Sequence, residues 1–403
     1  MRKSLFFVFT VLGLLAMISP AALATNGDNL IGIGPISRAM GGVGVAAPQD
    51  AISAIFSNPA AMCFGNYCPG SEAVFSGTYF SPTVKSKVDT SALGGAKGSA
   101  KSRMKPFVVP AIGVTSPIND RLRFGIGAYG VSGMGTDYKE RGAAYQNLYT
   151  KLEIMKFAPN LAYLITPDFS IGASLSIDYG NADFGSGSAH NYALGMQVGA
   201  LYHIGMFNFG ASYITPQRIT HERVADFNGD TILDNLDLES PHTFIFGVAA
   251  QPSPKLLAEF DVRWYNWADA KGYEDFDWEN QWVFALGVQY RPVAALALRA
   301  GFNYGKSPVN KHNGFNPMGT SNVQGINVPN VNYEMLRIVG FPAIVEKHLT
   351  CGIGYDITDR LLLNLSYMHA FEETIKEASA GNMASFESSL KEDSLSFGLT
   401  WRF

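Results

Sequence analysis

Apolar and polar residues alternate along most of this chain with a period of two, which is the period of side chains along a β-strand. Between Phe169 and Tyr179 every second residue is apolar, and the residues between them are small or polar. The same alternation occurs in residues 282–291, 296–304 and 395–403. One face of each predicted strand is therefore apolar, and the other face is small, polar or charged.

This pattern predicts fourteen strands. They fall at residues 71–85, 104–117, 121–132, 149–165, 169–180, 190–203, 206–217, 240–251, 255–268, 279–291, 295–305, 346–357, 361–371 and 391–403. Short turns and long loops alternate between them. The short turns lie at 117–120, 166–168, 204–205, 252–254, 292–294 and 358–360, and the long loops at 86–103, 133–148, 181–189, 218–239, 269–278, 306–345 and 372–390.

An even number of antiparallel strands, with short turns at one rim and long loops at the other, is typical of an outer-membrane β-barrel. Closing the sheet also leaves no unpaired backbone edge in lipid. We therefore predict an all-β fold, a transmembrane antiparallel β-barrel of 14 strands at residues 71–403. Its apolar face would contact lipid, and its polar face would line the lumen.

The first 24 residues have the features of a secretory signal peptide. Met1-Arg2-Lys3 is positively charged, an apolar stretch runs from Leu5 to Ile18, and Ala22-Leu23-Ala24 is a cleavage site of small residues. The apolar stretch is shorter than the roughly 20 residues of a spanning helix. We predict a signal peptide at 1–24 and a mature chain that starts near Thr25.

Composition agrees with a membrane barrel. Only 16% of the 403 residues are charged, against roughly 25% in soluble domains. The net charge of −4 with scattered basic residues predicts no nucleic-acid partner. Of the three cysteines, Cys63 and Cys68 are close enough in sequence to form a disulfide in an oxidising compartment, and Cys351 is left over. No spacing suits a zinc site, and no cofactor is expected.

Residues 25–70 do not alternate. They are rich in glycine and alanine, yet they carry too many apolar residues for a solvated tail, among them Leu30, Ile36 and Phe56. The simplest place to bury such a segment beside a fourteen-stranded barrel is inside it. We therefore predict an N-terminal hatch at 25–70 that plugs the lumen.

The run Gly34-Pro35-Ile36-Ser37-Arg38-Ala39-Met40-Gly41-Gly42, followed by Asn58-Pro59-Ala60, resembles the hatch of the FadL family. These are outer-membrane transporters of long-chain fatty acids and, in the TodX-like branch, of aromatic hydrocarbons. Further similar pieces follow in order, at 109–111, 117–121, 125–127, 159–163, 169–172, 264–267 and 352–355, so the resemblance covers essentially the whole mature chain. It implies that a hydrophobic ligand is caught among the outer loops, reaches a pocket against the hatch and leaves sideways at a kinked third strand.

Two sets of residues follow from this resemblance. Asn58-Pro59-Ala60 would set the conformation of the hatch. On the third strand, Gly125, Gly127 and Gly130 would allow the kink, because glycine within a strand marks bulges and bends. The alternative is that these small residues only leave room for the plug.

The outer loops give fewer signals. The largest loop, 306–345, is rich in apolar residues, whereas loop 181–189 is short. The first capture site is therefore expected to differ from that of the family, and no residues are assigned to it. Asp226, Asn228 and Asp230 resemble the start of a calcium loop, but the glycine of that motif is absent. We favour a solvated acidic loop and expect no metal.

Two arginines on the lumen face, Arg263 and Arg299, are candidates for binding a fatty-acid carboxylate. The alternative is that they pair with other lumen charges and with the hatch. No G-x-S-x-G motif or convincing Ser/His/acid set is present, so an enzyme is not expected.

We expect passive uptake of hydrophobic compounds, most of all long-chain fatty acids, across the bacterial outer membrane by a monomer. The partners would be the ligand and outer-membrane lipid. Uptake of aromatic hydrocarbons by the same mechanism is the alternative within this class. An outer-membrane lipid hydrolase and a narrow porin for polar solutes are alternatives from other classes.

Overall fold

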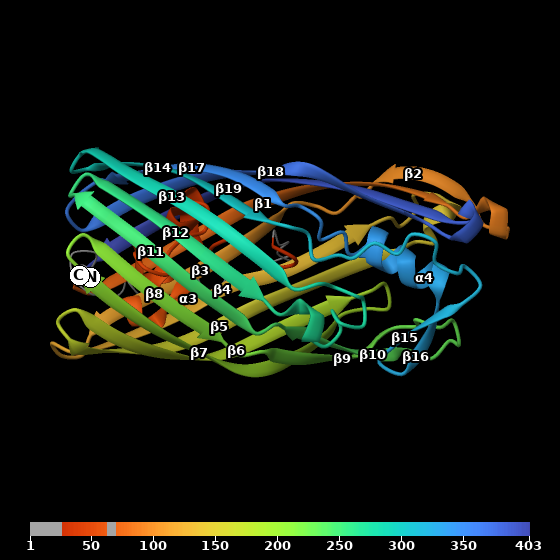
Figure 1. Ribbon diagram of the computed structural model, residues 1–403, viewed down its shortest axis with the longest axis horizontal. Helices are drawn as coiled ribbons and strands as arrows, with labels where there is room; N and C mark the ends of the chain where they lie inside the picture. Colours follow the sequence, from red (N-terminus) through yellow and green to blue (C-terminus); the bar gives the residue numbers. More distant parts are fainter. Residues whose placement is uncertain (1–25, 63–69) are drawn as a thin grey trace, which may run out of the picture.

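The computed structural model describes residues 26–62 and 70–403, which form a closed antiparallel β-barrel around an internal plug (Figure 1). The signal peptide, Cys63 and Cys68 lie outside the described residues. Fourteen strands make the wall, and pairing of β19 with β1 closes it. The wall strands are β1 (Glu72–Asp89), β3 (Phe107–Pro117), β4 (Leu122–Asp137), β5 (Tyr149–Thr166), β6 (Phe169–Asp183), β7 (Ala189–Ile204), β8 (Phe207–Ile214), β11 (Thr243–Ser253), β12 (Leu256–Tyr265), β13 (Gln281–Val293), β14 (Leu296–Gly305), β17 (Lys347–Asp356), β18 (Leu361–Ala378) and β19 (Ser385–Arg402). The predicted fold class is confirmed.

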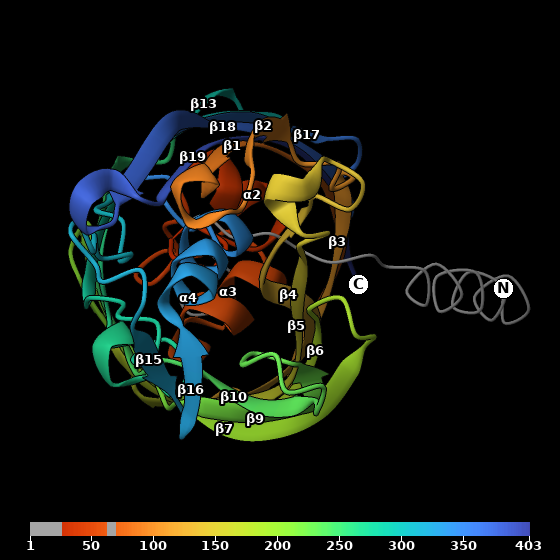
Figure 2. The same ribbon diagram turned by 90° about the vertical axis from the view of Figure 1, so that its right-hand side faces the viewer.

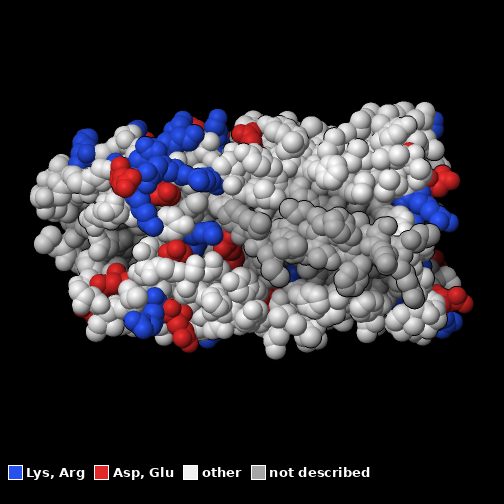
Figure 3. All heavy atoms as spheres, turned by 180° about the vertical axis from the view of Figure 1, so that it is seen from behind, with Lys and Arg blue, Asp and Glu red and all other residues white. Residues whose placement is uncertain are grey.

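The alternation in the sequence becomes the two faces of the wall. On β13, Trp282, Phe284 and Leu286 are exposed on the outside, whereas Val283 and Ala285 are buried toward the lumen. Charged side chains gather toward the two ends of the barrel, and the surface between them is mostly uncharged (Figure 3). This apolar band suits the hydrocarbon layer of a membrane.

At the end of the barrel that carries the long loops, the strands extend further than the sequence predicts. β18, β19 and β1 each contain 18 residues, and β2 (Lys97–Lys101) pairs with the outer end of β1. These ends pair through polar contacts, such as Lys87 Nζ to Glu387 Oε1 at 2.6 Å. The sequence does not predict these outer strand ends, because the apolar alternation stops where the strands leave the lipid.

The outer end is covered by elements from the loops. Two hairpins are formed by β9 (Gln217–Ala225) with β10 (Asp234–Ser240), and by β15 (Thr320–Val323) with β16 (Ile326–Pro329). A helix, α4 (Asn330–Met335), continues directly into a π-helical turn, η6 (Leu336–Gly340). Within residues 26–62 and 70–403, no helix is long and apolar enough to cross a membrane.

The described part of the predicted hatch lies inside the barrel (Figure 2). It contains α2 (Gly34–Ala39), α3 (Ala51–Ser57) and η1 (Pro59–Ala61). Pro35 lies in the first turn of α2, where its missing N–H is not needed. Asp50 caps α3 by accepting a hydrogen bond from the Ser53 N–H at 2.8 Å. Local sequence therefore sets the short helices, and burial in the lumen holds them.

Glycines on the lumen face make room for the hatch. A side chain at any of nine wall positions would place its Cβ within 2.8 Å of a hatch atom. We call these residues the glycine belt: Gly113, Gly125, Gly172, Gly199, Gly210, Gly287, Gly301, Gly352 and Gly398. Real Cβ atoms do not approach so closely, so the hatch and the wall fit each other over most of the circumference.

Candidate functional site

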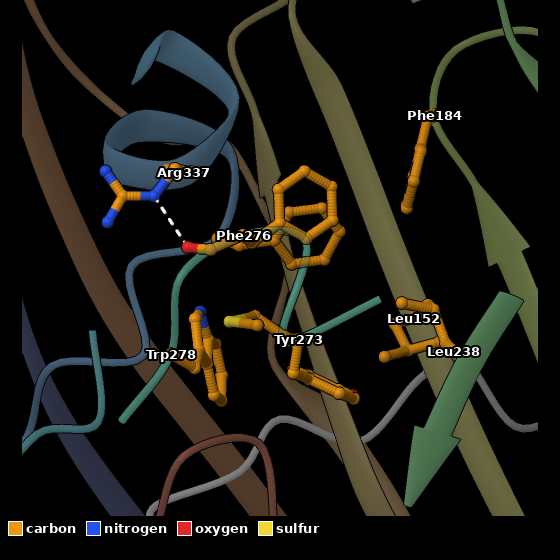
Figure 4. A pocket seen from close by; sticks show the side chains of 9 residues that line it. Leu152, Phe184, Leu238, Tyr273, Phe276, Trp278 and Arg337 are labelled. Carbon is orange, nitrogen blue, oxygen red and sulfur yellow. Dashed lines mark hydrogen bonds between the residues drawn. The ribbon is translucent and has the colours of Figure 1, made fainter. Parts of the chain in front are cut away.

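An apolar pocket lies inside the barrel near its outer end, and we call it the outer pocket (Figure 4). Its lining residues are Met134, Leu152, Phe184, Leu238, Tyr273, Phe276, Trp278, Arg337 and Phe341. Five of them are aromatic and one is charged. The cavity has a volume of about 20 Å³, room for about one water molecule. A hydrocarbon ligand can enter only if some of these side chains move.

Separate loops supply the aromatic residues. Tyr273, Phe276 and Trp278 come from the connection between β12 and β13, and the rings of Tyr273 and Trp278 lie 4.7 Å apart. Phe184 follows β6 and makes an edge contact with Phe341, which follows η6, at 5.1 Å. No period links such positions in the sequence, so the pocket could not be assembled from the chain alone. Phe341 is one of the apolar residues of the largest loop, and it is the residue of the outer pocket to which the sequence pointed.

The one charged residue of the outer pocket, Arg337, is fully engaged by the protein. Its Nε donates to the Phe276 carbonyl at 2.7 Å and its Nη2 to the Asn310 carbonyl at 2.8 Å. Its Nη1 donates to Glu334 and lies 3.5 Å from Glu377. The guanidinium is buried and turned away from the cavity toward these acceptors.

His312 joins two loops beside Arg337. Its Nδ1 lies 2.8 Å from Glu334 Oε1, and its Nε2 lies 2.6 Å from Asp277 Oδ2. The hydrogen bond with Glu334 raises the pKa of His312, although burial opposes the shift. Burial alone would raise the pKa of Glu334, but the contacts with His312 and Arg337 lower it. We call Asp277, His312, Glu334, Arg337 and Glu377 the outer latch.

The N-terminal segment forms the floor of the outer pocket. The Tyr273 hydroxyl donates to the Asp28 carboxylate. Gly27 lies against Trp267, because a Cβ there would be 2.8 Å from a ring carbon. Below this floor is a second cavity of about 50 Å³, the hatch cavity, whose lining includes Leu30, Phe56 and Lys156. Residues 26–30 thus separate the two cavities.

The third wall strand, β4, is irregular. It pairs with β3 only as far as Tyr129, and its register with β5 shifts between Gly130 and Ser132. The freed edge of β4 binds the N-terminal segment. Leu30 N donates to the Val131 carbonyl at 3.0 Å, and Gly133 N donates to the Asp28 carbonyl at 3.1 Å.

The structure separates the three glycines assigned to the third strand. Gly130 lies at the register shift. Gly125 faces Met62, and Gly127 faces Ile55, so both lie against the hatch. A lateral opening at this irregularity remains a prediction.

The two candidate arginines are bound within the lumen. Arg263 donates to the hatch carbonyls of Ile31, at 2.6 Å, and of Gly42. Arg299 donates to Gln289 at 2.7 Å and to Asn364 at 2.9 Å. Among the described residues, neither arginine lines the outer pocket, but Arg263 borders the hatch cavity. These contacts agree with the alternative given for the two arginines, in which they bind the hatch and lumen side chains rather than a ligand carboxylate.

Asn58-Pro59-Ala60 ties the hatch to the wall. Asn58 Oδ1 accepts from the Ala60 N–H at 3.0 Å and caps η1. Asn58 Nδ2 donates to the carbonyls of Val45 and Ala200, at 2.9 and 3.0 Å. Ser170 Oγ on β6 donates to the Ala60 carbonyl at 2.9 Å. The turn therefore contacts β6 and β7 directly.

The acidic loop at 226–230 is held by its own backbone. The Asp226 carboxylate accepts hydrogen bonds from the N–H groups of Gly229, Asp230 and Thr231. Asn228 Nδ2 donates to Asp230 at 3.0 Å. In the part of the chain that the structure describes, no group of three acidic, His or Cys residues could hold a metal ion. Cys351 is unpaired and exposed on the outer face of β17.

Comparison with known proteins agrees with this architecture. Residues 15–204 and 186–315 match the family described as outer membrane protein transport protein (OMPP1/FadL/TodX). A Pseudomonas aeruginosa FadL homologue superposes with a TM-score of 0.69 at 16% identity, covering 94% of this chain and 100% of that one. The P. putida toluene transporter TodX gives 0.67 at 18% identity, covering 92% and 99%.

A third solved structure, the CymD monoaromatic hydrocarbon channel, gives a TM-score of 0.60 at 17% identity, covering 94% of this chain and 99% of that one. No curated protein sequence matches. At these identities the solved structures show a shared fold. The family match extends over more than half of the chain, and the chain therefore belongs to the OMPP1/FadL/TodX family of outer-membrane transport channels for hydrophobic compounds.

Proposed function

We propose that this protein takes up neutral hydrophobic compounds, with aromatic hydrocarbons as the preferred ligands, rather than long-chain fatty acids. The observation that carries the proposal is the outer pocket, in which aromatic side chains surround the cavity and the single cation is already bound by carboxylates. Aromatic rings pack favourably against one another in edge and offset arrangements. A ligand ring can therefore insert between Phe184 and Phe341 when these loops separate.

Charge in the outer latch disfavours an anionic ligand. Three carboxylates, those of Asp277, Glu334 and Glu377, surround two basic side chains, His312 and Arg337. A fatty-acid carboxylate would have to displace Glu334 or Glu377 from Arg337. Removing one partner of a buried charge pair is costly. A neutral ring needs only the burial of apolar surface, which contributes roughly 25 cal/mol per Å².

Passage further inward requires the floor of the outer pocket to move. The contact between Tyr273 and Asp28 and the two backbone bonds to β4 hold residues 26–30 in place. Displacing this segment joins the outer pocket to the hatch cavity. Transport is expected to be passive, because burial of its apolar surface drives a hydrocarbon from water into the barrel and on into lipid.

Uptake of labelled toluene and labelled oleate tests the proposal, in cells whose only such transporter is this protein. We expect toluene uptake above the empty-vector level and oleate uptake close to it. Binding to the purified protein, followed by quenching of tryptophan fluorescence, gives a second readout. Faster uptake of oleate than of toluene would contradict the proposal.

A pair of tryptophans provides a matched variant. Trp278 lines the outer pocket, whereas Trp282 is exposed on the lipid face of β13. Loss of one aromatic contact costs about 0.5–1.5 kcal/mol, so Trp278→Ala is expected to weaken toluene binding about two- to tenfold. Trp282→Ala is expected to leave binding unchanged.

Glu334→Gln sharpens the choice between neutral and anionic ligands. The substitution keeps the shape of the side chain and removes one negative charge from Arg337. A hydrogen bond to a charged group contributes about 1.5–3 kcal/mol, so we expect benzoate binding to strengthen about tenfold or more while toluene binding stays nearly constant. Benzoate binding that does not respond to this substitution would count against the charge argument.

A further inference from the structure

The outer end of the barrel carries opposite charges on its two sides. Residues 83–106, which contain the outer part of β1 together with β2, include six basic residues and one acidic residue. Segments 218–239 and 269–279 include three basic and eleven acidic residues, and they touch where Glu239 N donates to the Lys271 carbonyl at 2.9 Å. The hairpin of β9 and β10 lies across the rim from β2 (Figure 2). Because the whole chain has a net charge of −4, the basic side is a local accumulation.

Three lysines of the basic side share the outward face of three neighbouring strands. Lys85 of β1 follows the buried Val84 and is exposed. Lys101 of β2 is exposed, and Lys391 of β19 follows the buried Leu390. In the view from behind, basic side chains gather toward the outer end of the barrel (Figure 3). We call Lys85, Lys101 and Lys391 the lysine triad.

The strand register brings the lysine triad together. Lys85 lies directly opposite Lys101 on one side and directly opposite Ser389 on the other. Lys391 is two residues from Ser389, so it is the diagonal neighbour of Lys85. Opposite residues have Cβ atoms about 4.5–5.5 Å apart, and diagonal neighbours about 7–8 Å. The three flexible side chains can therefore reach a single anion.

The protein itself neutralises the lysine triad poorly. Like charges placed directly opposite each other destabilise a sheet, and Lys85 and Lys101 are such a pair. The carboxylate of Glu372 lies 3.8 Å from Lys85 Nζ, and both side chains are largely exposed. Exposed ion pairs contribute little. Among the described residues, Lys101 and Lys391 form no ion pair.

The acidic residue nearest to Lys391 along its strand is already engaged. Asp393 Oδ1 accepts a hydrogen bond from the Tyr367 hydroxyl at 2.6 Å and lies 2.8 Å from His369 Nδ1. Its charge attracts Lys391 only from beyond ion-pair distance. The contacts with Tyr367 and His369 hold this carboxylate on β18 and β19, below the lysine triad.

Neighbouring lysines show what full neutralisation looks like. Lys87 Nζ lies 2.6 Å from Glu387 Oε1, and Lys97 Nζ lies 2.8 Å from Asp89 Oδ2. Each of these two lysines has a close carboxylate of its own. The basic side therefore contains paired lysines around a group that is left with excess positive charge.

The lysine triad stands just above the lipid-facing band. Tyr79 and Leu395 are opposite each other, exposed and apolar, and tyrosine is typical of the membrane interface. Lys391 comes four residues after this level on the way outward, which is roughly 13 Å along a strand. The usual strand tilt shortens this to roughly 10 Å in height. Lysine side chains are long enough to reach down from there to the headgroup layer.

We propose that the lysine triad binds a phosphate monoester on a lipid headgroup of the outer leaflet, with the acyl chains of that lipid lying along Tyr79 and Leu395. A phosphate monoester has three acceptor oxygens and up to two negative charges, which matches three ammonium groups. A phosphodiester headgroup has two free oxygens and one charge, so it fits less well. The partner is therefore a glycolipid whose sugars carry phosphate monoesters, as lipid A does. This inference does not depend on which compound is transported.

Binding of lipid A to the purified protein tests the proposal. Native mass spectrometry and thermal unfolding measure it, with dephosphorylated lipid A and phosphatidylglycerol for comparison. The triple variant Lys85→Gln, Lys101→Gln and Lys391→Gln is expected to bind lipid A at least tenfold more weakly. Without lipid it should be as stable as the unmodified protein or more stable, because the repulsion between opposite lysines is removed.

A second triple variant removes the same charge from the acidic side. Arg218, Lys271 and Lys306 each pair with a carboxylate there. Arg218→Gln with Lys271→Gln and Lys306→Gln is expected to leave lipid A binding unchanged. If the two triple variants lose affinity equally, binding follows the net charge of the protein, and the proposal is wrong.

Single substitutions provide a test that does not depend on the triple variants. Glu387→Gln frees Lys87 beside the lysine triad, and we expect lipid A to bind several-fold more tightly. Glu279→Gln frees Lys306 on the acidic side and should change nothing. Unchanged affinity in the Glu387→Gln protein would contradict the proposal. If inorganic phosphate stabilises the protein as strongly as lipid A at equal concentration, or dephosphorylated lipid A binds as tightly, a phosphorylated headgroup is not the ligand.

Discussion

Two parts of the barrel wall hold together in different ways. Between β1 and β19 the register runs without interruption from Glu72 opposite Arg402 to Asp89 opposite Ser385. Between β4 and β6 it shifts at Gly130 and is interrupted at Pro159. In lipid an unbroken ladder cannot part without leaving polar groups unpaired. The comparison teaches that such a wall can open only where the chain has already lost ladder bonds.

Two leucines of similar exposure give the largest expected effect. Leu286 on β13 is 48% exposed and lies within unbroken ladders. Leu175 on β6 is 47% exposed and borders a hollow of about 450 Å³ on the lipid side of β4 to β7. Arginine on the lipid face costs about 2–4 kcal/mol near the midplane, and we expect this loss for Leu286→Arg. Leu175→Arg should cost less, because the Pro159 carbonyl in the gap opposite it lacks a ladder bond and can accept a hydrogen bond. Equilibrium unfolding in lipid vesicles measures both, and equal losses would contradict the difference between the two walls.

The glycine belt allows a test on the regular part of the wall. At Gly301 a Cβ would lie 2.2 Å from Gly41 N of the hatch, whereas at Gly77 it would meet nothing within 4 Å. Gly301→Val is expected to lower the free energy of unfolding by about 1–3 kcal/mol through overpacking. Gly77→Val should change it little, since valine favours strands. Thermal unfolding and proteolysis of the hatch give the comparison, and similar behaviour of the two variants would show that the hatch can shift.

Two serines sharpen the comparison further. The Ser174 hydroxyl contacts the Pro159 carbonyl at 3.2 Å, where the pairing of β5 with β6 is interrupted. The Ser396 hydroxyl contacts Thr78 Oγ1 at 2.8 Å, where the backbone ladder is complete. Either alanine substitution removes a hydrogen bond worth about 0.5–1.5 kcal/mol. Only Ser174→Ala should also accelerate hydrogen exchange of neighbouring β5 and β6 amides. Faster hydrogen exchange of the amides near residue 396 in the Ser396→Ala variant would contradict this prediction. It would show that a complete backbone ladder does not protect the wall by itself.

The smallest effect is expected from pH at the outer latch. The raised pKa of His312 means that its contribution is complete below its unfolded value of about 6.5 and is lost as the pH rises through the folded pKa. Burial opposes the lowered pKa values of Glu334 and Asp277, but hydrogen bonds with His312 prevail, so their contributions are lost as the pH falls through the folded values.

The latch is therefore strongest between about pH 4 and pH 6.5. Above this range the latch weakens by about 0.3–1 kcal/mol, the scale of partly exposed pairs. We expect this weakening to speed toluene binding about two- to fivefold. Stopped-flow fluorescence across this range measures the rate. His312→Gln, which does not titrate, should reduce the pH dependence to that of Glu377, whose pKa burial raises to about 7. With Glu377→Gln added, the dependence should disappear, and a dependence that survives both substitutions would assign it to a group outside the latch.

The sequence predicts the wall well because lipid on one side and a packed lumen on the other impose a period of two. Trp282, Phe284 and Leu286 already show which face they occupy. The outer pocket was not predictable, since Phe184, Trp278 and Arg337 come from loops without any period. The interruption of the ladder between β5 and β6 could be predicted in part. Pro159 was visible within a predicted strand, but its effect depends on Ser174 of the next strand, and only the register shows that the two meet.

The fit between hatch and wall has a consequence for the order of assembly. The hatch precedes every wall strand in the chain, yet Pro35 packs on Gly398 of β19, and Arg38 Nη2 donates to Ser394 Oγ at 2.7 Å. The last strand thus meets the first one around a hatch that is already in place. A circular permutant in which the hatch follows β19 would have to thread buried Arg38 into a finished lumen, and we expect its maturation to stall before closure. In the natural protein we therefore expect β19 to close on β1 only after the hatch occupies the lumen.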